Sequence, residues 1–317
     1  MSKVVSLGIH IVDVLGRPVA SVPAGQGLAL LDLIRFTVAG TAAGTSIDMA
    51  KLGLEVVTMG AIGQDEIGDF LIATMQRFGV NTESLVRKEN AQTSCTMLPI
   101  RPNGERPALH VIGANGELTI DDINFNAISQ AKYLHMGGAP LMRKFDGKPA
   151  SQVLKFARDQ GVTTTFDLLG IPQPNLAELI DVCLPYIDFF MPNFEEAQMI
   201  CGLSGTDDIL SHFLDRGASH VVLRLGEKGC VVAWQENGSV KQVKVPAFEV
   251  PVVDSTGCGD GYNAGFIKGL SLKWDLEQCA RLGSACGGLV IQGLGSDAGI
   301  ENFEQVLEFA RTAQIKA

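Results

Sequence analysis

The sequence lacks the patterns by which metal centres and disulfide frameworks are usually recognised. Its seven cysteines are scattered and contain no CxxC pair, which argues against both a thiolate zinc site and a disulfide scaffold. The five histidines show neither HxxxH nor HExxH spacing, so no histidine metal site is indicated. We expect reduced cysteines, most of them filling the core.

Long apolar runs and clusters of positive charge are also missing. No apolar run approaches the roughly 18 residues that a membrane helix needs, and the N-terminal segment lacks the layout of a signal peptide. The net charge is −10 without any Lys/Arg run, whereas binding to phosphate backbones needs a basic face. We therefore expect a cytoplasmic protein that binds neither nucleic acid nor membranes.

Short apolar strands alternate with helices along most of the 317 residues. The predicted strands cover 3–16, 55–63, 131–138, 162–170, 187–192, 219–226, 229–234 and 239–246. The predicted helices cover 65–79, 150–161, 175–184, 193–202 and 207–216, and helices dominate after 257. A further helix is predicted after a small-residue turn within 39–53, and another from about 121. This alternation is typical of a mostly parallel sheet covered on both faces. We predict one α/β domain over 1–317 with a three-layer α/β/α architecture.

One stretch interrupts this alternation. Residues 93–113 contain two strand-like runs separated by "RPNGER", where Asn103-Gly104 is a strong hairpin signal. Because a hairpin here breaks the α/β pattern, we expect it to leave the main sheet. Together with segments near 12–20 and 32–39, it is predicted to form a small β-sheet lid.

The stretch "VVDSTGCGDGYNAGFIKGL" (252–270) joins a glycine-rich turn to the start of a predicted helix. Gly257 and Gly259 let the backbone approach an anion closely, and a helix N-terminus favours negative charge. The spacing fits neither a Walker loop nor GxGxxG. Asp260 adds a carboxylate to this anion site. It is either a general base beside a bound phosphoryl group or a first-turn residue favoured by the helix dipole.

The segment "DSTGCGDGYNAGF" resembles the C-terminal signature of the ribokinase-like (PfkB) carbohydrate kinase family, D-T-x-G-A-G-D-x-F-x-x-G-F. Other marks of that family follow in order along nearly the whole chain. The resemblance implies a ribokinase-like fold and a kinase that uses ATP and Mg²⁺. It also implies that Asp260 activates the acceptor hydroxyl, and that the backbone amides of Gly257, Cys258 and Gly259 form an anion hole.

The nucleotide side of the implied site has two clear motifs and two departures. "MPNFEEA" resembles the N-x-x-E element, which makes Asn193 and Glu196 candidates for ordering Mg²⁺ through water, although alone they read as a capping box. "LRLGEKG" is similar to the nucleotide-binding turn that carries Gly226 and Gly229. The departures are Arg224, which either pairs with phosphate or faces solvent, and Ser284, which stands where an Asn near the adenine is frequent.

The resemblance implies a set of substrate residues: Asp13, Gly40, Thr41, Gly44, Thr45 and Arg106. Asp13 is expected to bind sugar hydroxyls, or else to be an ordinary aspartate at a strand end. Gly44 replaces the family's Asn, which removes a side chain that both donates and accepts hydrogen bonds, and Thr45 is a candidate to compensate. Arg106 lies in "NGER", which resembles the tip of the lid hairpin.

The sequence allows two roles for Asp254. Some family members hold a monovalent cation near this aspartate and a C-terminal loop, here "GLGSDAG" (293–299), so the resemblance implies a potential K⁺ site. The other reading is an Asx turn that fixes the backbone before the helix. By the same resemblance, we expect a homodimer that pairs through the lid.

The expected function is phosphoryl transfer from ATP to a hydroxyl of a sugar or sugar-like molecule. The alternative within the family is a nucleoside kinase, because the loop at Gly44 leaves room for a base. A catalytically weak nucleotide sensor would have lost parts of the site, whereas Asp260, Asn193 and Glu196 are all present. A Rossmann oxidoreductase would need GxGxxG after the first strand, where "GIHIVDVLG" stands.

Overall fold

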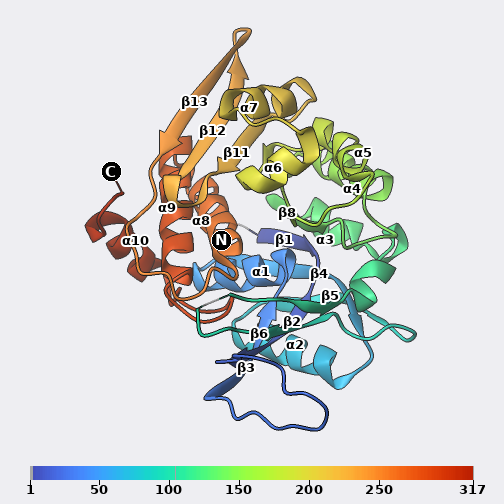
Figure 1. Ribbon diagram of the computed structural model, residues 1–317. Helices are drawn as coiled ribbons and strands as arrows, with labels where there is room; N and C mark the ends of the chain where they lie inside the picture. The colour runs from blue at the N-terminus through green and yellow to red at the C-terminus, as the bar shows by residue number, and fades with distance from the viewer. Residues whose placement is uncertain (1–2, 104, 317) are drawn as a thin grey trace.

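The computed structural model describes residues 3–103 and 105–316. Its core is a nine-stranded sheet in the order β13-β12-β11-β10-β9-β8-β1-β4-β5 (Figure 1). The strands are β1 (Lys3–Gly8), β4 (Glu55–Gly63), β5 (Asn81–Lys88), β8 (Tyr133–Ala139), β9 (Thr163–Leu168), β10 (Phe189–Phe190), β11 (His220–Arg224), β12 (Cys230–Glu236) and β13 (Ser239–Val245). The seven strands from β11 to β5 run parallel, while β12 and β13 add an antiparallel pair at one edge. The prediction of a mostly parallel sheet is confirmed.

Ten α-helices accompany the sheet within the described ranges. They are α1 (Thr41–Lys51), α2 (Glu66–Arg77), α3 (Phe125–Ser129), α4 (Lys148–Asp159), α5 (Leu176–Asp181), α6 (Phe194–Cys201), α7 (Thr206–Asp215), α8 (Cys258–Ser271), α9 (Leu276–Val290) and α10 (Phe303–Thr312). None of these described helices is long and apolar enough to cross a membrane.

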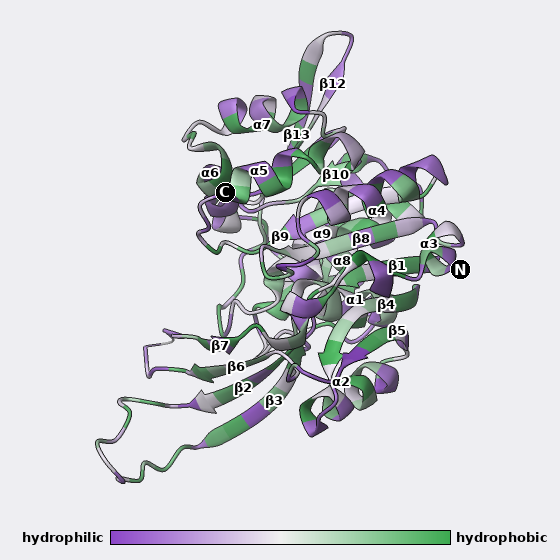
Figure 2. Cartoon of the chain, turned by 90° about the vertical axis from the view of Figure 1, so that its right-hand side faces the viewer, coloured by the Kyte–Doolittle hydropathy of each residue, from purple (hydrophilic) through white to green (hydrophobic). Residues whose placement is uncertain are grey.

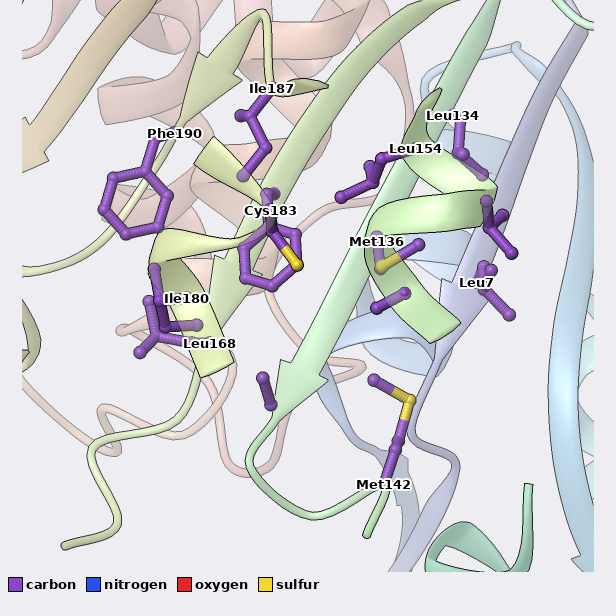
Figure 3. Close-up of a cluster of buried hydrophobic side chains, with 14 of the residues drawn as sticks. Leu7, Leu134, Met136, Met142, Leu154, Leu168, Ile180, Cys183, Ile187 and Phe190 are labelled. Carbon is purple, nitrogen blue, oxygen red and sulfur yellow. The ribbon is translucent and has the colours of Figure 1, made fainter. Parts of the chain in front are cut away.

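The side chains of β1 point alternately into two separate cores, as the two-residue period of a strand requires. Val4 packs in a cluster with residues of α1, α8 and α9, whereas Val5 and Leu7 belong to the cluster under α4 to α7. Figure 3 shows part of this second cluster, where Leu7 lies near Leu134 and Met136 of β8 and below Leu154 of α4. Two cores on opposite faces of one sheet give three layers, as the sequence predicts.

A second sheet of four strands stands apart from the first, in the order β3-β2-β6-β7. Its strands are β2 (Ile11–Arg17), β3 (Leu33–Ala39), β6 (Cys95–Pro99) and β7 (Leu109–Val111). In Figure 2 this small sheet projects from one side of the molecule, and α2 lies beside its base. The segments near 12–20, 32–39 and 93–113 thus meet in one sheet. Gly104 of the Asn103-Gly104 turn lies outside the described residues.

Two elements differ from the sequence prediction. The opening segment is not one strand, because the chain leaves the main sheet at Gly8 and enters the small sheet at Ile11. Gly8 has a φ of +150°, and a side chain there would collide with the backbone of Gly137, so a continuous β-branched strand is prevented at this point. The second difference is β5, an edge strand that the sequence analysis does not predict.

Candidate active site

The N-terminus of helix α8 is open toward the carboxyl edge of the main sheet. Gly257 is its N-cap residue, with a left-handed φ of 76°, and no described side chain caps the helix. The first-turn amides therefore have no partner within the helix, and the helix dipole favours an anion there. A Cβ at Gly257 would lie 2.5 Å from the Cα of Ser296, so loop 293–299 packs directly behind this turn.

Asp260 lies in the first turn of α8 and is buried, with 8% of its surface exposed. Its carboxylate faces Gly44 of α1, where a Cβ would lie only 2.7 Å from Oδ2. Burial raises the pKa of Asp260 well above its usual range, and the negative charges of Asp167 and Asp48 raise it further. This is the behaviour expected of a carboxylate that has to take up a proton near neutral pH.

Arg224, at the end of β11, lies at the centre of a buried polar network. Its Nη2 donates to Asp167 Oδ1 at 2.7 Å and to Glu196 Oε2 at 3.4 Å. Asn263, on α8, donates from Nδ2 to Asp167 Oδ2 at 2.6 Å. Burial opposes the charge of Arg224, but Asp167 and Glu196 outweigh it and raise the pKa of the guanidinium. The alternative in which Arg224 faces solvent is wrong, because only 11% of its side chain is exposed.

The guanidinium of Arg224 also adjoins the predicted anion hole. A Cβ built on Gly259 would overlap Arg224 Nη1, so only glycine lets the turn approach this cation so closely. One positive charge therefore lies behind the open amides of α8. A phosphoryl group bound at those amides would lie within reach of this field.

Asn193 and Glu196 form the capping box that the sequence suggests. Asn193 Oδ1 accepts from the Glu196 amide and Glu196 Oε2 accepts from the Asn193 amide, both at 2.8 Å. Among the described residues, both hydrogen bonds to this carboxylate reach Oε2, which leaves Oε1 for a hydrated cation. Burial and the charge of Asp167 raise the pKa of Glu196 to about 7. Carboxylate oxygens of this kind suit Mg²⁺ bound through water.

The other residues predicted on the nucleotide side lie along one edge of the site. Gly226 and Gly229 form the turn between β11 and β12 and have left-handed φ values of 59° and 87°. Ser284 lies on α9, with Oγ 3.9 Å from Cys230 Sγ. A parallel bridge joins Asn193 to Arg224, so the two predicted nucleotide motifs are neighbours in space.

On the substrate side, the small sheet carries a row of polar side chains across its strands. Asp13 of β2 pairs in register with Thr37 of β3 and Thr96 of β6, and Thr96 pairs with His110 of β7. Thr96 Oγ1 and His110 Nδ1 lie 3.0 Å apart. Asp13 is 5% exposed, and burial raises its pKa to about 6. Asp13 lies within a strand of the small sheet, so the strand-end alternative is wrong.

Several buried polar atoms near the start of α1 have no partner within the described chain. They are the hydroxyls of Thr37, Thr41 and Thr45 and Nε2 of His135. α1 begins after Gly40, which has a φ of 97°, and no described side chain caps it. A buried hydroxyl without a partner costs stability unless a ligand or water satisfies it. The start of α1 is therefore suited to a molecule rich in hydroxyl groups.

Asp254 and Arg106 form an ion pair at the mouth of the glycine turn. Arg106 Nη1 donates to Asp254 Oδ1 at 2.7 Å, and its Nη2 donates to Ser255 Oγ at 2.8 Å. Asp254 Oδ1 also accepts from the Thr256 amide at 3.0 Å, as an Asx turn requires. Substrate binding by Arg106 stays a prediction, because the described contacts of its guanidinium are to this turn.

Three residues of the site were missed in the sequence analysis: Asp167, Asn263 and His135. A signal existed for Asp167, which lies in the C-terminal half of the predicted strand "VTTTFDLLG", near the edge where open α/β sheets bind ligands. Asn263 lies one helical turn after Asp260, on the same face of α8. His135 lies inside a buried strand, and nothing in its spacing marks it.

A family model described as pfkB family carbohydrate kinase matches residues 1–302. The chain belongs to this family of carbohydrate kinases. It is therefore a phosphotransferase with an alcohol group as acceptor.

This kinase has curated relatives and solved structural neighbours of similar length. An uncharacterized sugar kinase of Archaeoglobus fulgidus is 27% identical over 80% of this chain and 97% of its own length. The 2-dehydro-3-deoxygluconokinase of Bacillus subtilis is 24% identical over 86% of each chain. A structure of Arabidopsis thaliana ribokinase complexed with ribose and ATP superposes with a TM-score of 0.82 at 21% identity, covering 98% of this chain and 99% of that chain. The Arabidopsis thaliana structure shares the fold, and the names of the last two proteins give different acceptors.

Proposed function

We propose that this kinase transfers the γ-phosphoryl group of ATP to a hydroxyl of a small neutral sugar, with Asp260 as the general base. The observation that carries the proposal is the position of Asp260. Its buried carboxylate lies in the first turn of α8 beside open amides and next to Arg224. The amides and the guanidinium suit the charge of the transferred group, and the carboxylate suits the proton of the attacking hydroxyl.

Mg²⁺ belongs to this proposal because the site is rich in carboxylates. Asp167, Glu196 and Asp260 surround a single guanidinium, that of Arg224, and ATP adds further negative charge. Glu196 Oε1 and the side chain of Asn193 are the groups that we assign to the hydrated ion. Bound Mg²⁺ neutralises phosphate charge during transfer.

The substrate pocket is assigned to the space between the polar row of the small sheet and the start of α1. Asp13, Thr41 and Thr45 offer one buried carboxylate and two buried hydroxyls to the hydroxyl groups of a sugar. A free cation would favour a sugar acid, whereas the cationic side chains that we find around the pocket are already paired with carboxylates. These pairs are Arg224 with Asp167, Arg106 with Asp254, and Arg35 with Asp297.

The nucleoside alternative has less support than the sugar. It depends on open space beside Gly44, and in the structure the Asp260 carboxylate occupies that side of α1. A panel of neutral sugars, sugar acids and nucleosides, assayed by ADP release with NMR of the product, tests this choice. We expect the highest kcat/KM with a neutral sugar. A nucleoside or a sugar acid as the best substrate would overturn this assignment.

Asp260→Asn tests the chemistry directly. We expect kcat for the best sugar to fall by about 10²–10⁴-fold, the usual contribution of a general base. The unfolding midpoint should stay the same or rise, because burial disfavours the ionised carboxylate and the amide carries no charge. Asp69→Asn is the matched control, since Asp69 lies exposed on α2. Turnover of Asp260→Asn within about twofold of the wild type would exclude Asp260 as the base.

We also propose that the kinase is a homodimer joined through the outer face of the small sheet. The side chains opposite the polar row are apolar and exposed: Ile34, Phe36, Met97, Leu109 and Val111 are between 46% and 61% exposed. Phe36, Val14 and Met97 occupy one cross-strand row. A second copy of the same face would cover these side chains.

A further inference from the structure

Two loops meet behind the anion hole, and their oxygen atoms are the ones that a K⁺ ion near Asp254 would need. Residues 252–257 carry the Asp254 carboxylate, and residues 293–299 carry backbone carbonyls. The two loops are joined directly, because Gly295 N donates to Asp254 Oδ2 at 2.9 Å. Ser296 packs against Gly257 and donates from Oγ to the Val38 carbonyl at 2.6 Å. The position of Gly257 therefore depends on how this pair of loops is held.

Positively charged side chains already donate hydrogen bonds to several of these oxygens. Arg106 Nη1 donates to Asp254 Oδ1 at 2.7 Å. Arg35 Nη1 donates to the Leu294 carbonyl at 2.7 Å. Lys51 Nζ donates to the Asp297 carbonyl at 2.6 Å. Three oxygens of these two loops thus accept hydrogen bonds from a guanidinium or ammonium group.

The Asp254 carboxylate has little capacity left for a metal ion. Besides Arg106, Oδ1 accepts from Thr256 N at 3.0 Å and from Thr256 Oγ1 at 2.7 Å. The residue is 4% exposed. Burial opposes ionisation, but the bonds from Thr256, Gly295 and Arg106 lower the pKa of Asp254. The carboxylate is therefore ionised, and its charge is balanced by Arg106.

The charges around the loops are also balanced without an added ion. Arg35 Nη2 pairs with Asp297 Oδ1 at 2.8 Å. Lys51 Nζ lies 3.6 Å from Asp48 Oδ1. Three cationic side chains thus lie near three carboxylates, those of Asp48, Asp254 and Asp297, and burial raises the pKa of Asp48 to about 7, which reduces its negative charge near neutral pH. A K⁺ ion placed among them would add an uncompensated positive charge in a largely buried site.

We infer that Arg106, assisted by Arg35 and Lys51, replaces a bound monovalent cation in this kinase by supplying positive charge to the loops behind the anion hole. We also infer that catalysis is independent of K⁺. The inference rests on the proposed phosphoryl transfer at α8. Arg35 lies on β3 of the small sheet, and Arg106 lies in the connection between β6 and β7. Two of the charges that hold the anion-hole loops therefore belong to the same part of the fold as Asp13. Arg106 is a positioning residue, because its guanidinium contacts Asp254 and Ser255 in the turn before the anion hole.

The test compares the rates of the wild type and of Arg106→Ala in K⁺ and in tetramethylammonium at equal ionic strength. We expect the wild-type rate to agree in the two salts within about twofold. Arg106→Ala should lose about tenfold or more in kcat and regain part of it with K⁺ or free guanidinium, because either can fill the place of the lost charge. Arg311→Ala is the matched control, since Arg311 pairs only with Glu308 on the surface of α10 among the described residues.

Two kinetic outcomes overturn the inference. One is a wild-type rate that rises by about fivefold or more with K⁺, and the other is an Arg106→Ala rate that equals the wild-type rate in both salts. If no substrate is phosphorylated in either salt, the proposed function fails, and the unfolding midpoint decides this inference separately. A wild-type midpoint that rises in K⁺ relative to tetramethylammonium overturns it. The inference is supported if the wild-type unfolding midpoint is the same in both salts, and if the midpoint of Arg106→Ala is lower and is partly restored by K⁺.

Discussion

The ionisable side chains around the first turn of α8 come from four separate elements. Asp167 is the second-last residue of β9, Glu196 lies in the first turn of α6, Arg224 ends β11, and Asp260 lies on α8. Only one of the four is positive, and all of them are largely buried. Carboxylates that share one guanidinium in a low-dielectric site raise one another's pKa. Burial first, and this crowding in addition, raise the pKa of Asp260 as the proposed chemistry requires.

The pH dependence of catalysis tests this crowding. Asp260 acts as a base only when ionised, so its raised pKa places the acidic limb of kcat/KM above the ordinary aspartate range. Asp167→Asn removes a negative neighbour and frees the charge of Arg224, and both changes favour the ionised form of Asp260. We expect the acidic limb of the pH profile to move to lower pH.

The same pH profile of Asp69→Asn supplies the comparison, because that carboxylate is exposed and pairs with Arg87 on the surface. It should leave the limb where it is. An Asp167→Asn limb that stays in place or moves to higher pH would contradict the role assigned to the neighbouring charge.

At the scale of elements, helices α1 and α8 start at the same place and present open N-termini to one site. Gly40 and Gly257 begin them without side-chain caps among the described residues, and Gly44 of α1 meets Asp260 of α8. The helix that offers amides to the substrate side therefore packs against the helix that carries the proposed base. This packing explains the glycine at 44 without reference to the substrate.

Gly44→Ala tests the packing of the two helices. Its Cβ would lie 2.7 Å from Asp260 Oδ2, so the carboxylate has to move. Because catalysis depends on sub-ångström placement, we expect kcat to fall by about tenfold or more. Alanine also favours the helix by about 0.5–1 kcal/mol, so a large loss of stability is not expected.

Ala50→Gly, on the same helix, is the complementary control for this variant. It should lower the unfolding midpoint and leave kcat unchanged, because Ala50 packs with the core below α1. Full kcat in Gly44→Ala, measured beside an intact circular dichroism spectrum, would show that the contact with Asp260 has no catalytic importance.

At the scale of the whole molecule, the two faces of the small sheet differ: one is polar and lines the proposed substrate site, and the other is apolar and is the proposed dimer interface. One face carries Asp13 and Thr37 and packs against loop 293–299, where a Cβ on Gly295 would lie 2.7 Å from Thr37. The other face is apolar and open, because Ile34, Phe36 and Met97 are each more than half exposed. Because successive side chains of a strand point to opposite faces, neighbouring residues contribute to the substrate face and to the apolar face in turn.

The oligomeric state tests the outer face. We expect light scattering after gel filtration to give twice the mass of one chain, and the double variant Phe36→Asp/Met97→Asp to give the mass of a single chain, because charges at both positions oppose burial. Asp69→Asn should remain dimeric. A wild-type protein that elutes as a monomer across the micromolar range would refute the proposed dimer.

The sequence by itself determined the layered architecture and the reaction type. Strand and helix periods are local properties, so "VTTTFDLLG" or the helix from Asn193 can be recognised from a few neighbours. The glycine turn before Asp260 is equally local, because φ and the approach of a ligand constrain single residues.

The tertiary structure alone decided which distant charges meet. Arg224 pairs with Asp167, 57 positions away, and Arg106 pairs with Asp254, 148 positions away; neither pairing leaves a mark in local spacing. The break of the opening strand at Gly8 likewise depends on the backbone of Gly137, which approaches from β8. Ion pairs and close contacts are set by the three-dimensional path of the chain, and these long-range contacts determine how the small sheet, the anion hole and the proposed base are held together.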